Sequence, residues 1–177
     1  MKKTLACTMF LGVLVSLPAA AAELIFKGGI GVIPVSSGVA VAPTPPTALV
    51  VESVNRNIVR NVQPAGQIWV IDELDAQVSA TGNITVRGEG LVLGGGNGAG
   101  GVPAGLSVYA TLSCLSTSPF GLSSTSFAGV PVSPNGNFQI NGKLSPTPTF
   151  PCASPLLLIQ SAANAHWFAF GIVSSGH

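Results

Sequence analysis

Apolar and polar residues alternate at a spacing of two along much of this chain, and this spacing is typical of β-strands. Residues 106–114, LSVYATLSC, carry apolar side chains at every second position and hydroxyl-bearing side chains between them. Residues 138–145, FQINGKLS, show the same pattern. Because successive side chains of a strand point to opposite faces, we expect these strands to bury one face and expose the other, as antiparallel sheets do.

Two glycine-bearing turns connect pairs of such stretches. The turn TGN at residues 81–83 separates two alternating arms within residues 75–93. The turn PNGN at residues 134–137 joins residues 126–133 to residues 138–145. Glycine and asparagine tolerate the positive φ angles that tight turns between strands require. The sequence therefore predicts two β-hairpins.

The C-terminal region differs, because residues 155–162, PLLLIQSA, contain a continuous apolar run. A run of this length predicts a strand that is covered on both faces. Residues 166–173, HWFAFGIV, are expected to form its partner strand. One face of that strand should hold Phe168, Phe170 and Ile172, and the other Trp167, Ala169 and Val173. His166 then lies at the mouth of the strand, where we interpret it as a structural residue, with a ligand or catalytic role as the alternative.

The remaining stretches complete an all-β fold. Residues 23–48 are expected to form a loosely structured edge segment and a proline-rich connector, because Pro34 argues against a central strand. Residues 67–71, QIWVI, predict another strand with Trp69 in the core. Residues 49–177 are then expected to form one antiparallel β-sandwich, immunoglobulin-like or jelly-roll-like, with about seven to nine short strands.

The N-terminal residues 1–22 predict a secretory signal peptide. Lys2 and Lys3 precede an apolar run, and Pro18 and several alanines follow it, as signal peptidase requires. An uncleaved membrane anchor is the alternative, since the apolar stretch approaches a spanning length. Cys7 lies at the front of the apolar run, whereas a lipid-carrying cysteine would stand at its end. We therefore expect an exported protein of the periplasm, cell surface or medium.

Cleavage changes the charge balance of the chain. Without Lys2 and Lys3, five basic residues stand against six acidic ones, which gives a formal charge of −1. Nucleic-acid binding depends on a basic face that neutralises phosphates, and this composition supplies none. We expect no nucleic-acid partner and, after cleavage, no membrane partner. A protein or a glycan partner is left open.

Cys114 and Cys152 remain after cleavage, and an even pair in an exported chain predicts a disulfide. A metal site is the alternative, but two thiols without CxxC spacing and two distant histidines match it poorly. We therefore predict neither a metal nor a cofactor.

Two motifs suggest contact surfaces rather than catalysis. Residues 96–101, GNGAGG, match the letters of a dinucleotide fingerprint, but a strand and not a helix is expected to follow them. We interpret this stretch as a loop whose Asn97 is a candidate contact residue. Residues 72–75, DELD, hold Asp72 and Asp75, which could begin a calcium shell, but a solvated turn is the simpler interpretation.

The stretches VRGEGLVL, VYATLSC and PLLLIQSAANAHWFAFGI resemble segments of a group of uncharacterised exported proteins, over roughly residues 67 to 173. This resemblance implies an exported domain and brings no catalytic residues.

The expected function is a non-catalytic binding or structural role outside the inner membrane, because no convergent set of titratable residues is evident. The chain lacks GxSxG, and its bases are His166 and His177. A hydrolase or a metal-dependent enzyme using Asp72, Glu73, Asp75 or His166 is the first alternative. A subunit that assembles by adding an edge strand, such as residues 31–42, is the second.

Overall fold

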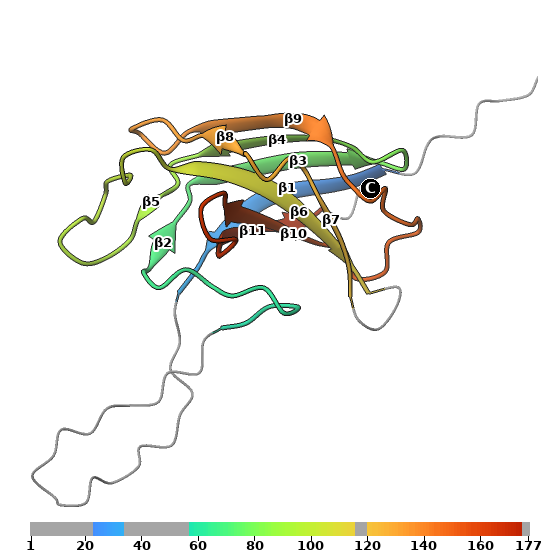
Figure 1. Ribbon diagram of the computed structural model, residues 1–177, viewed down its shortest axis with the longest axis horizontal. Helices are drawn as coiled ribbons and strands as arrows, with labels where there is room; N and C mark the ends of the chain where they lie inside the picture. The colour runs from blue at the N-terminus through green and yellow to red at the C-terminus, as the bar shows by residue number, and fades with distance from the viewer. Residues whose placement is uncertain (1–22, 34–56, 116–119, 175–177) are drawn as a thin grey trace, which may run out of the picture.

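A computed structural model describes residues 23–33, 57–115 and 120–174 of the chain (Figure 1). These residues form eleven strands, and none of them is helical. The described part of the chain therefore offers no helix that could cross a membrane. The strands are β1 Glu23–Gly31, β2 Trp69–Val70, β3 Glu73–Ser79, β4 Asn83–Glu89, β5 Val92–Leu93, β6 Ser107–Cys114, β7 Gly121–Ser124, β8 Val130–Pro131, β9 Phe138–Lys143, β10 Leu156–Ser161 and β11 Trp167–Val173.

Nine of the strands form a single antiparallel sheet in the order β7-β6-β10-β11-β1-β3-β4-β9, with β8 paired to β6. The two ends of this sheet approach each other, because Ser124 of β7 and Ser145 after β9 form an antiparallel bridge. Their amides donate to each other's carbonyls at 3.0 and 2.8 Å. The sheet therefore nearly closes on itself, while β2 and β5 form a small second sheet.

The predicted all-β, antiparallel and disulfide-bridged fold is confirmed. The two packed layers belong to one bent sheet, so the layers of the expected sandwich are continuous with each other (Figure 1). The number of strands exceeds the expected seven to nine because β2, β5 and β8 are only two residues long.

The core lies inside the bend of the sheet, where the alternating apolar residues of most strands meet. The alternation is clearest in β3 and β4, whose burial changes at every residue. Gly88 has a specific role, because a side chain there would overlap the ring of Phe138 on the neighbouring strand. The inward-facing buried side chains are Phe26, Leu74, Ala76, Val78, Ile84, Val86, Val108, Ala110, Leu112, Phe138, Ile140, Leu157, Ile159 and Ala169.

The first predicted hairpin is present and joins β3 to β4. The second predicted turn also forms, because the Ser133 amide donates to the Asn137 carbonyl at 2.9 Å, but the strands on either side of it do not pair with each other: β8 pairs with β6, and β9 pairs with β4. Gly82 has φ +83° and Gly136 has φ +85°, which are values that a residue with a side chain adopts only with strain. Trp69 is buried as expected and packs on Phe168 at 4.3 Å between ring centroids.

The N-terminal strand departs from its expected position. β1 lies between β3 and β11 and pairs with both, so residues 23–31 are central rather than an edge segment. Pro34 does not disrupt this strand, because β1 ends at Gly31. The proline that argued against a central strand thus lies beyond it, and residues 34–48 are outside the described residues.

The second departure concerns the outer face of β6. The alternation predicted a water-exposed face, but Tyr109, Thr111 and Ser113 are 3%, 1% and 0% exposed. Residues 57–67, which we call the covering segment, contribute to this burial, because Arg60 bonds to Ser113 and residues 61–63 lie beside Tyr109 and Thr111. In Figure 1 the covering segment runs below β10 and β11, on the side away from β3 and β4. The expectation that β10 is covered on both faces is confirmed.

The covering segment is fixed to the sheet by backbone hydrogen bonds. The amide of Ala65 donates to the carbonyl of Trp167 at 3.0 Å, and the Trp167 amide donates to Gln63 at 2.9 Å. The Trp167 indole Nε1 also donates to the carbonyl of Asn57 at 3.2 Å. Trp167 therefore binds the covering segment through both its backbone and its indole ring.

Trp167 and Phe170 share the outer face of β11, although the sequence pattern placed them on opposite faces. Trp167 pairs with Gln160 and Phe170 pairs with Leu158, and those two partners lie on one face of β10. The rings of Trp167 and Phe170 meet at 6.1 Å. A β-bulge explains the difference, because the register shift opposite Ile159 and Gln160 adds one residue to β11.

Candidate ligand-binding groove

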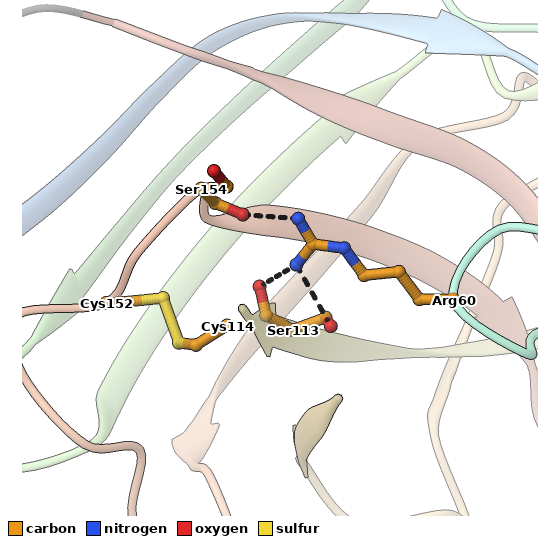
Figure 2. The surroundings of a disulfide bond; sticks show 5 residues. All are labelled: Arg60, Ser113, Cys114, Cys152 and Ser154. Carbon is orange, nitrogen blue, oxygen red and sulfur yellow. Dashed lines mark hydrogen bonds between the residues drawn. A yellow bond between two sulfur atoms is a disulfide. The ribbon is translucent and has the colours of Figure 1, made fainter. Parts of the chain in front are cut away.

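A disulfide lies at one end of the covered face. Cys114, the last residue of β6, is bonded to Cys152, and the two Cα atoms are 5.1 Å apart (Figure 2). The predicted pairing is confirmed. The bridge ties the end of β6 to the loop that enters β10, and these are the two strands beneath the covering segment.

Arg60 holds the covering segment against this end of the sheet. Its guanidinium donates to the carbonyl oxygen of Ser113 at 2.7 Å, to the Ser113 hydroxyl at 3.1 Å and to the carbonyl oxygen of Ser154 (Figure 2). The guanidinium also lies 5.6 Å from the centroid of the Phe120 ring. Desolvation lowers the pKa of Arg60 from its ordinary value, but hydrogen bonds of this kind keep arginine charged.

The local sequence allows Arg60 to reach the sheet. Val59 and Val62 exchange backbone hydrogen bonds of 3.1 and 2.9 Å around Arg60 and Asn61. Both central residues have positive φ, +48° and +65°. This is the geometry of a tight hairpin turn with two left-handed residues, for which asparagine is well suited.

Beyond the covering segment, the outer face of the sheet forms an open groove of about 620 Å³, which we call the outer groove. This volume is typical of small-ligand sites, which span about 300–1,000 Å³. Strands β6, β7 and β10 supply its floor through Tyr109, Thr111, Leu122, Ser124 and Gln160. Loops supply its walls through Asn61, Val62, Gln63, Phe127, Ser145, Pro146, Asn164, Ala165 and His166.

The floor of the outer groove carries buried polar groups. Gln160 is 4% exposed, and its Nε2 donates to the carbonyl of Ala165 at 2.7 Å. The Thr111 and Ser124 hydroxyls bond each other at 2.8 Å. Register explains why these groups meet, because Thr111 pairs with Ser124 on one side and Tyr109 pairs with Gln160 on the other.

Two polar atoms of the floor remain available to a ligand. Within the described residues, no hydrogen bond uses the Tyr109 hydroxyl or the Gln160 Oε1 atom, and no fully buried side-chain polar atom lacks a partner. Both residues line the outer groove, so a ligand in it would lie beside these two groups. Burial of the ring raises the pKa of Tyr109, so this hydroxyl keeps its proton and can donate a hydrogen bond at neutral pH.

One wall of the outer groove is aromatic. Phe127 lies in the turn after β7 and is 67% exposed. Its ring meets Tyr109 edge-on, at 5.1 Å between centroids and 81° between planes. Such an edge-to-face pair is favourable and leaves a Phe127 surface open to a ligand.

The sequence-based candidates fall in different places. His166 is half-buried and lines the outer groove, and its backbone amide donates to Asn164 Oδ1 at 3.1 Å. Asp75 lies elsewhere, on the outer face of β3, where it pairs with Lys27 at 3.1 Å. Asp72 is exposed and precedes β3, and Asn97 is exposed in the loop after β5. The structure therefore brings none of these three to His166.

The described residues contain no group of three or more histidine, cysteine, aspartate or glutamate side chains that could hold a metal ion. Residues 72–75, interpreted above as a solvated turn with a calcium shell as the other possibility, instead lead into a strand: Asp72 directly precedes β3, and Asp75 lies on it, with Leu74 buried between them. The glycine-rich residues 96–101 form a turn without a helix after it, as expected from the sequence.

The sequence analysis missed Tyr109, Gln160 and Phe127. Gln160 carried the one usable signal, because it is an amide at the end of an apolar run that was expected to be covered on both faces. Nothing in the local pattern marks Tyr109 or Phe127, because both depend on segments that are distant in the sequence.

Comparison of the chain with protein-family models, with curated proteins and with solved structures finds no match. The resemblance to uncharacterised exported proteins therefore stays a prediction.

Proposed function

We propose that this protein is an exported, non-catalytic binding protein that holds a small ligand in the outer groove. Its disulfide is compatible with an oxidising compartment, where such bonds persist. Export is thus consistent with the covalent structure of the protein.

The observation that carries the binding role is the combination of a groove with buried polar groups. Tyr109, Thr111 and Gln160 are almost completely buried yet line the groove, and no hydrogen bond among the described residues uses the Tyr109 hydroxyl or the Gln160 Oε1 atom. Burying polar groups costs free energy unless they gain hydrogen bonds, so such groups are more typical of a ligand site than of the protein interior.

The same groove favours binding over catalysis. Among its lining residues, Tyr109 and His166 are the ones that ionise, and neither has a carboxylate among the other lining residues to orient it. Hydrolysis by a nucleophile requires a base with an orienting acid. The acids that could supply this partner, Asp72 and Asp75, lie elsewhere.

Assembly by strand addition receives less support. A donated strand needs an unpaired sheet edge. In the described residues, β1 is paired on both sides, and the end strands approach each other through the Ser124–Ser145 bridge. Most of residues 31–42, the segment considered for this role, lies outside the described residues.

The binding role is tested by screening a chemically diverse small-molecule library against the ¹⁵N-labelled protein by NMR. We expect ligands that shift the amide signals of Tyr109, Ser124 and Gln160 while leaving Thr85, on the opposite outer face, unchanged. A library that produces no such ligand, or only ligands at other surfaces, would contradict the proposal.

Export is tested separately by isolating the protein from a bacterial host and sequencing its N-terminus. We expect the mature chain to begin near Glu23 in the exported fraction. A chain that keeps residues 1–22 and stays with the inner membrane would favour the anchor instead.

A further inference from the structure

We propose that the outer groove recognises a neutral saccharide, by stacking a sugar ring on Phe127 and by hydrogen bonding its hydroxyl groups to Tyr109 and Gln160. This inference rests on the proposed binding function and specifies its ligand class. Three properties of the groove lead to it: an exposed aromatic ring, hydroxyl and amide groups without a hydrogen-bond partner among the described residues, and the lack of Asp, Glu, Lys and Arg among the described residues that line it.

The aromatic ring accounts for the apolar half of recognition. Phe127 is 67% exposed, although burying aromatic surface is strongly favourable. The ring is held in place by its edge-on contact with Tyr109, so a ligand meets a surface that is already oriented. A sugar ring presents C–H groups on one face, and these can pack on the electron-rich face of an aromatic ring.

The floor accounts for the polar half of recognition. Tyr109 Oη donates and accepts, while Gln160 Oε1 accepts because its Nε2 already binds the Ala165 carbonyl. A sugar hydroxyl can donate to one and accept from the other. A purely apolar ligand would bury both atoms without partners, and each loss would weaken binding.

A peptide strand fits the groove less well. Extended peptides gain affinity through main-chain hydrogen bonds to a free sheet edge. The floor of the groove is instead a sheet face whose backbone groups are already paired between β6, β7 and β10. A ligand there can bond only to side chains, and the available ones are hydroxyls and amides.

The charges disfavour an anionic ligand. The nearby guanidinium of Arg60 already donates to Ser113 and Ser154. Arginine or lysine is the usual partner of carboxylate and phosphate groups, and the part of the groove lining that the structure describes contains neither. Neutral sugars should therefore bind better than sulfated or acidic ones of the same size.

The experiment screens the purified disulfide-bonded protein on an array of neutral and acidic glycans, followed by NMR titration with the best neutral ligand. Phe127→Ala should weaken binding by about tenfold, and Phe127→Trp should retain it because the aromatic surface is kept. Tyr109→Phe, which removes only the hydroxyl, should weaken binding by roughly two- to tenfold. Leu115→Ala, another exposed apolar residue outside the groove, is the matched control and should bind normally.

The outcomes separate the two proposals. Binding of acidic glycans alone, or binding of neutral glycans that neither Phe127→Ala nor Tyr109→Phe weakens, would overturn the saccharide site. If no glycan binds while library compounds still shift the groove signals, the saccharide inference is wrong and the binding function stands. If neither glycans nor library compounds bind, both are wrong. Melting temperatures of all variants identify any that fold poorly, and Tyr109→Phe still tests the site if Phe127→Ala does not fold.

Discussion

The outer faces of two regions of this sheet, β3–β4 and β6–β10, have opposite environments although their strands are similar. On β3 and β4, outward residues such as Gln77, Thr85 and Arg87 are exposed to water. On β6 and β10, outward residues such as Tyr109 and Leu158 are buried beneath the covering segment or in the outer groove. Both pairs of strands are antiparallel with regular register.

The difference arises outside the strands. A short irregular segment, residues 57–67, is fastened to Trp167 by backbone hydrogen bonds and to the end of β6 by Arg60. The faces of β3, β4 and β9 have no equivalent cover in the described residues. The covering segment lies over only part of this face, and the outer groove lies beside it. The covering segment therefore shapes the candidate site together with the sheet.

The largest expected effect comes from removing the disulfide at the covered end. Replacing Cys114 and Cys152 with alanine frees a loop closed by a bridge across 38 positions. Chain entropy then predicts a loss of about 4 kcal/mol in the free energy of unfolding. Urea denaturation of the oxidised protein, the reduced protein and the double variant measures it. Equal stability of all three would show that the bridge does not support the covered face.

A direct comparison of the two faces uses one residue from each. Leu158→Ala, on the covered face, should lower the free energy of unfolding by roughly 2–5 kcal/mol because it leaves a cavity. Thr85→Ala, an outward residue of β4, should change it by less than about 0.5 kcal/mol. Denaturant titration of both variants is the measurement. Similar small losses would mean that the covering segment does not bury Leu158 in solution.

Two arginines provide a finer comparison. Arg60→Ala removes three hydrogen bonds across the covered face and should cost about 1–2 kcal/mol. Arg87→Ala removes an exposed ion pair with Glu89 and should cost between zero and about 1 kcal/mol. Hydrogen exchange should also become faster in residues 57–67 of the Arg60 variant alone. Unchanged exchange there would exclude Arg60 as the anchor of the covering segment.

The sequence was sufficient for the features that depend on local pattern. Alternation identified the strands, glycine marked both turns, although only the first joins a paired hairpin, and the cysteine pair predicted the bridge between Cys114 and Cys152. The unbroken run of apolar residues in β10 correctly indicated burial on both faces. These signals are local because each is set by φ angles or by side-chain direction within a few residues.

The features that depend on distant contacts were missed. Alternation in β6 cannot show that residues 57–67 return to cover its polar face, because a half-polar strand looks the same whether its second face meets water or a loop. The register shift in β11 likewise reversed the predicted face of Trp167 relative to Phe170. The outer groove is lined by segments that are far apart in the sequence, which explains why His166 was its only residue among the candidates.

The central claim is that residues on the outer face of β6 are largely buried beside the outer groove instead of lying on an open sheet surface, and Tyr109 tests it most directly. It is the single tyrosine of the chain, so absorbance during alkaline titration reports its ionisation alone. Burial raises its pKa in the folded protein. The neutral hydroxyl therefore contributes stability fully below the unfolded value of about 10, and that contribution is lost as pH rises through the folded pKa.

The measurement compares the ionisation midpoint of Tyr109 in the native protein with that in urea-denatured protein. We predict a higher midpoint in the native state, and Arg60→Ala should lower it toward the denatured value by loosening the cover. Coincident midpoints in the native and denatured proteins would show that Tyr109 faces water, and the covered face and its groove would then not exist in solution.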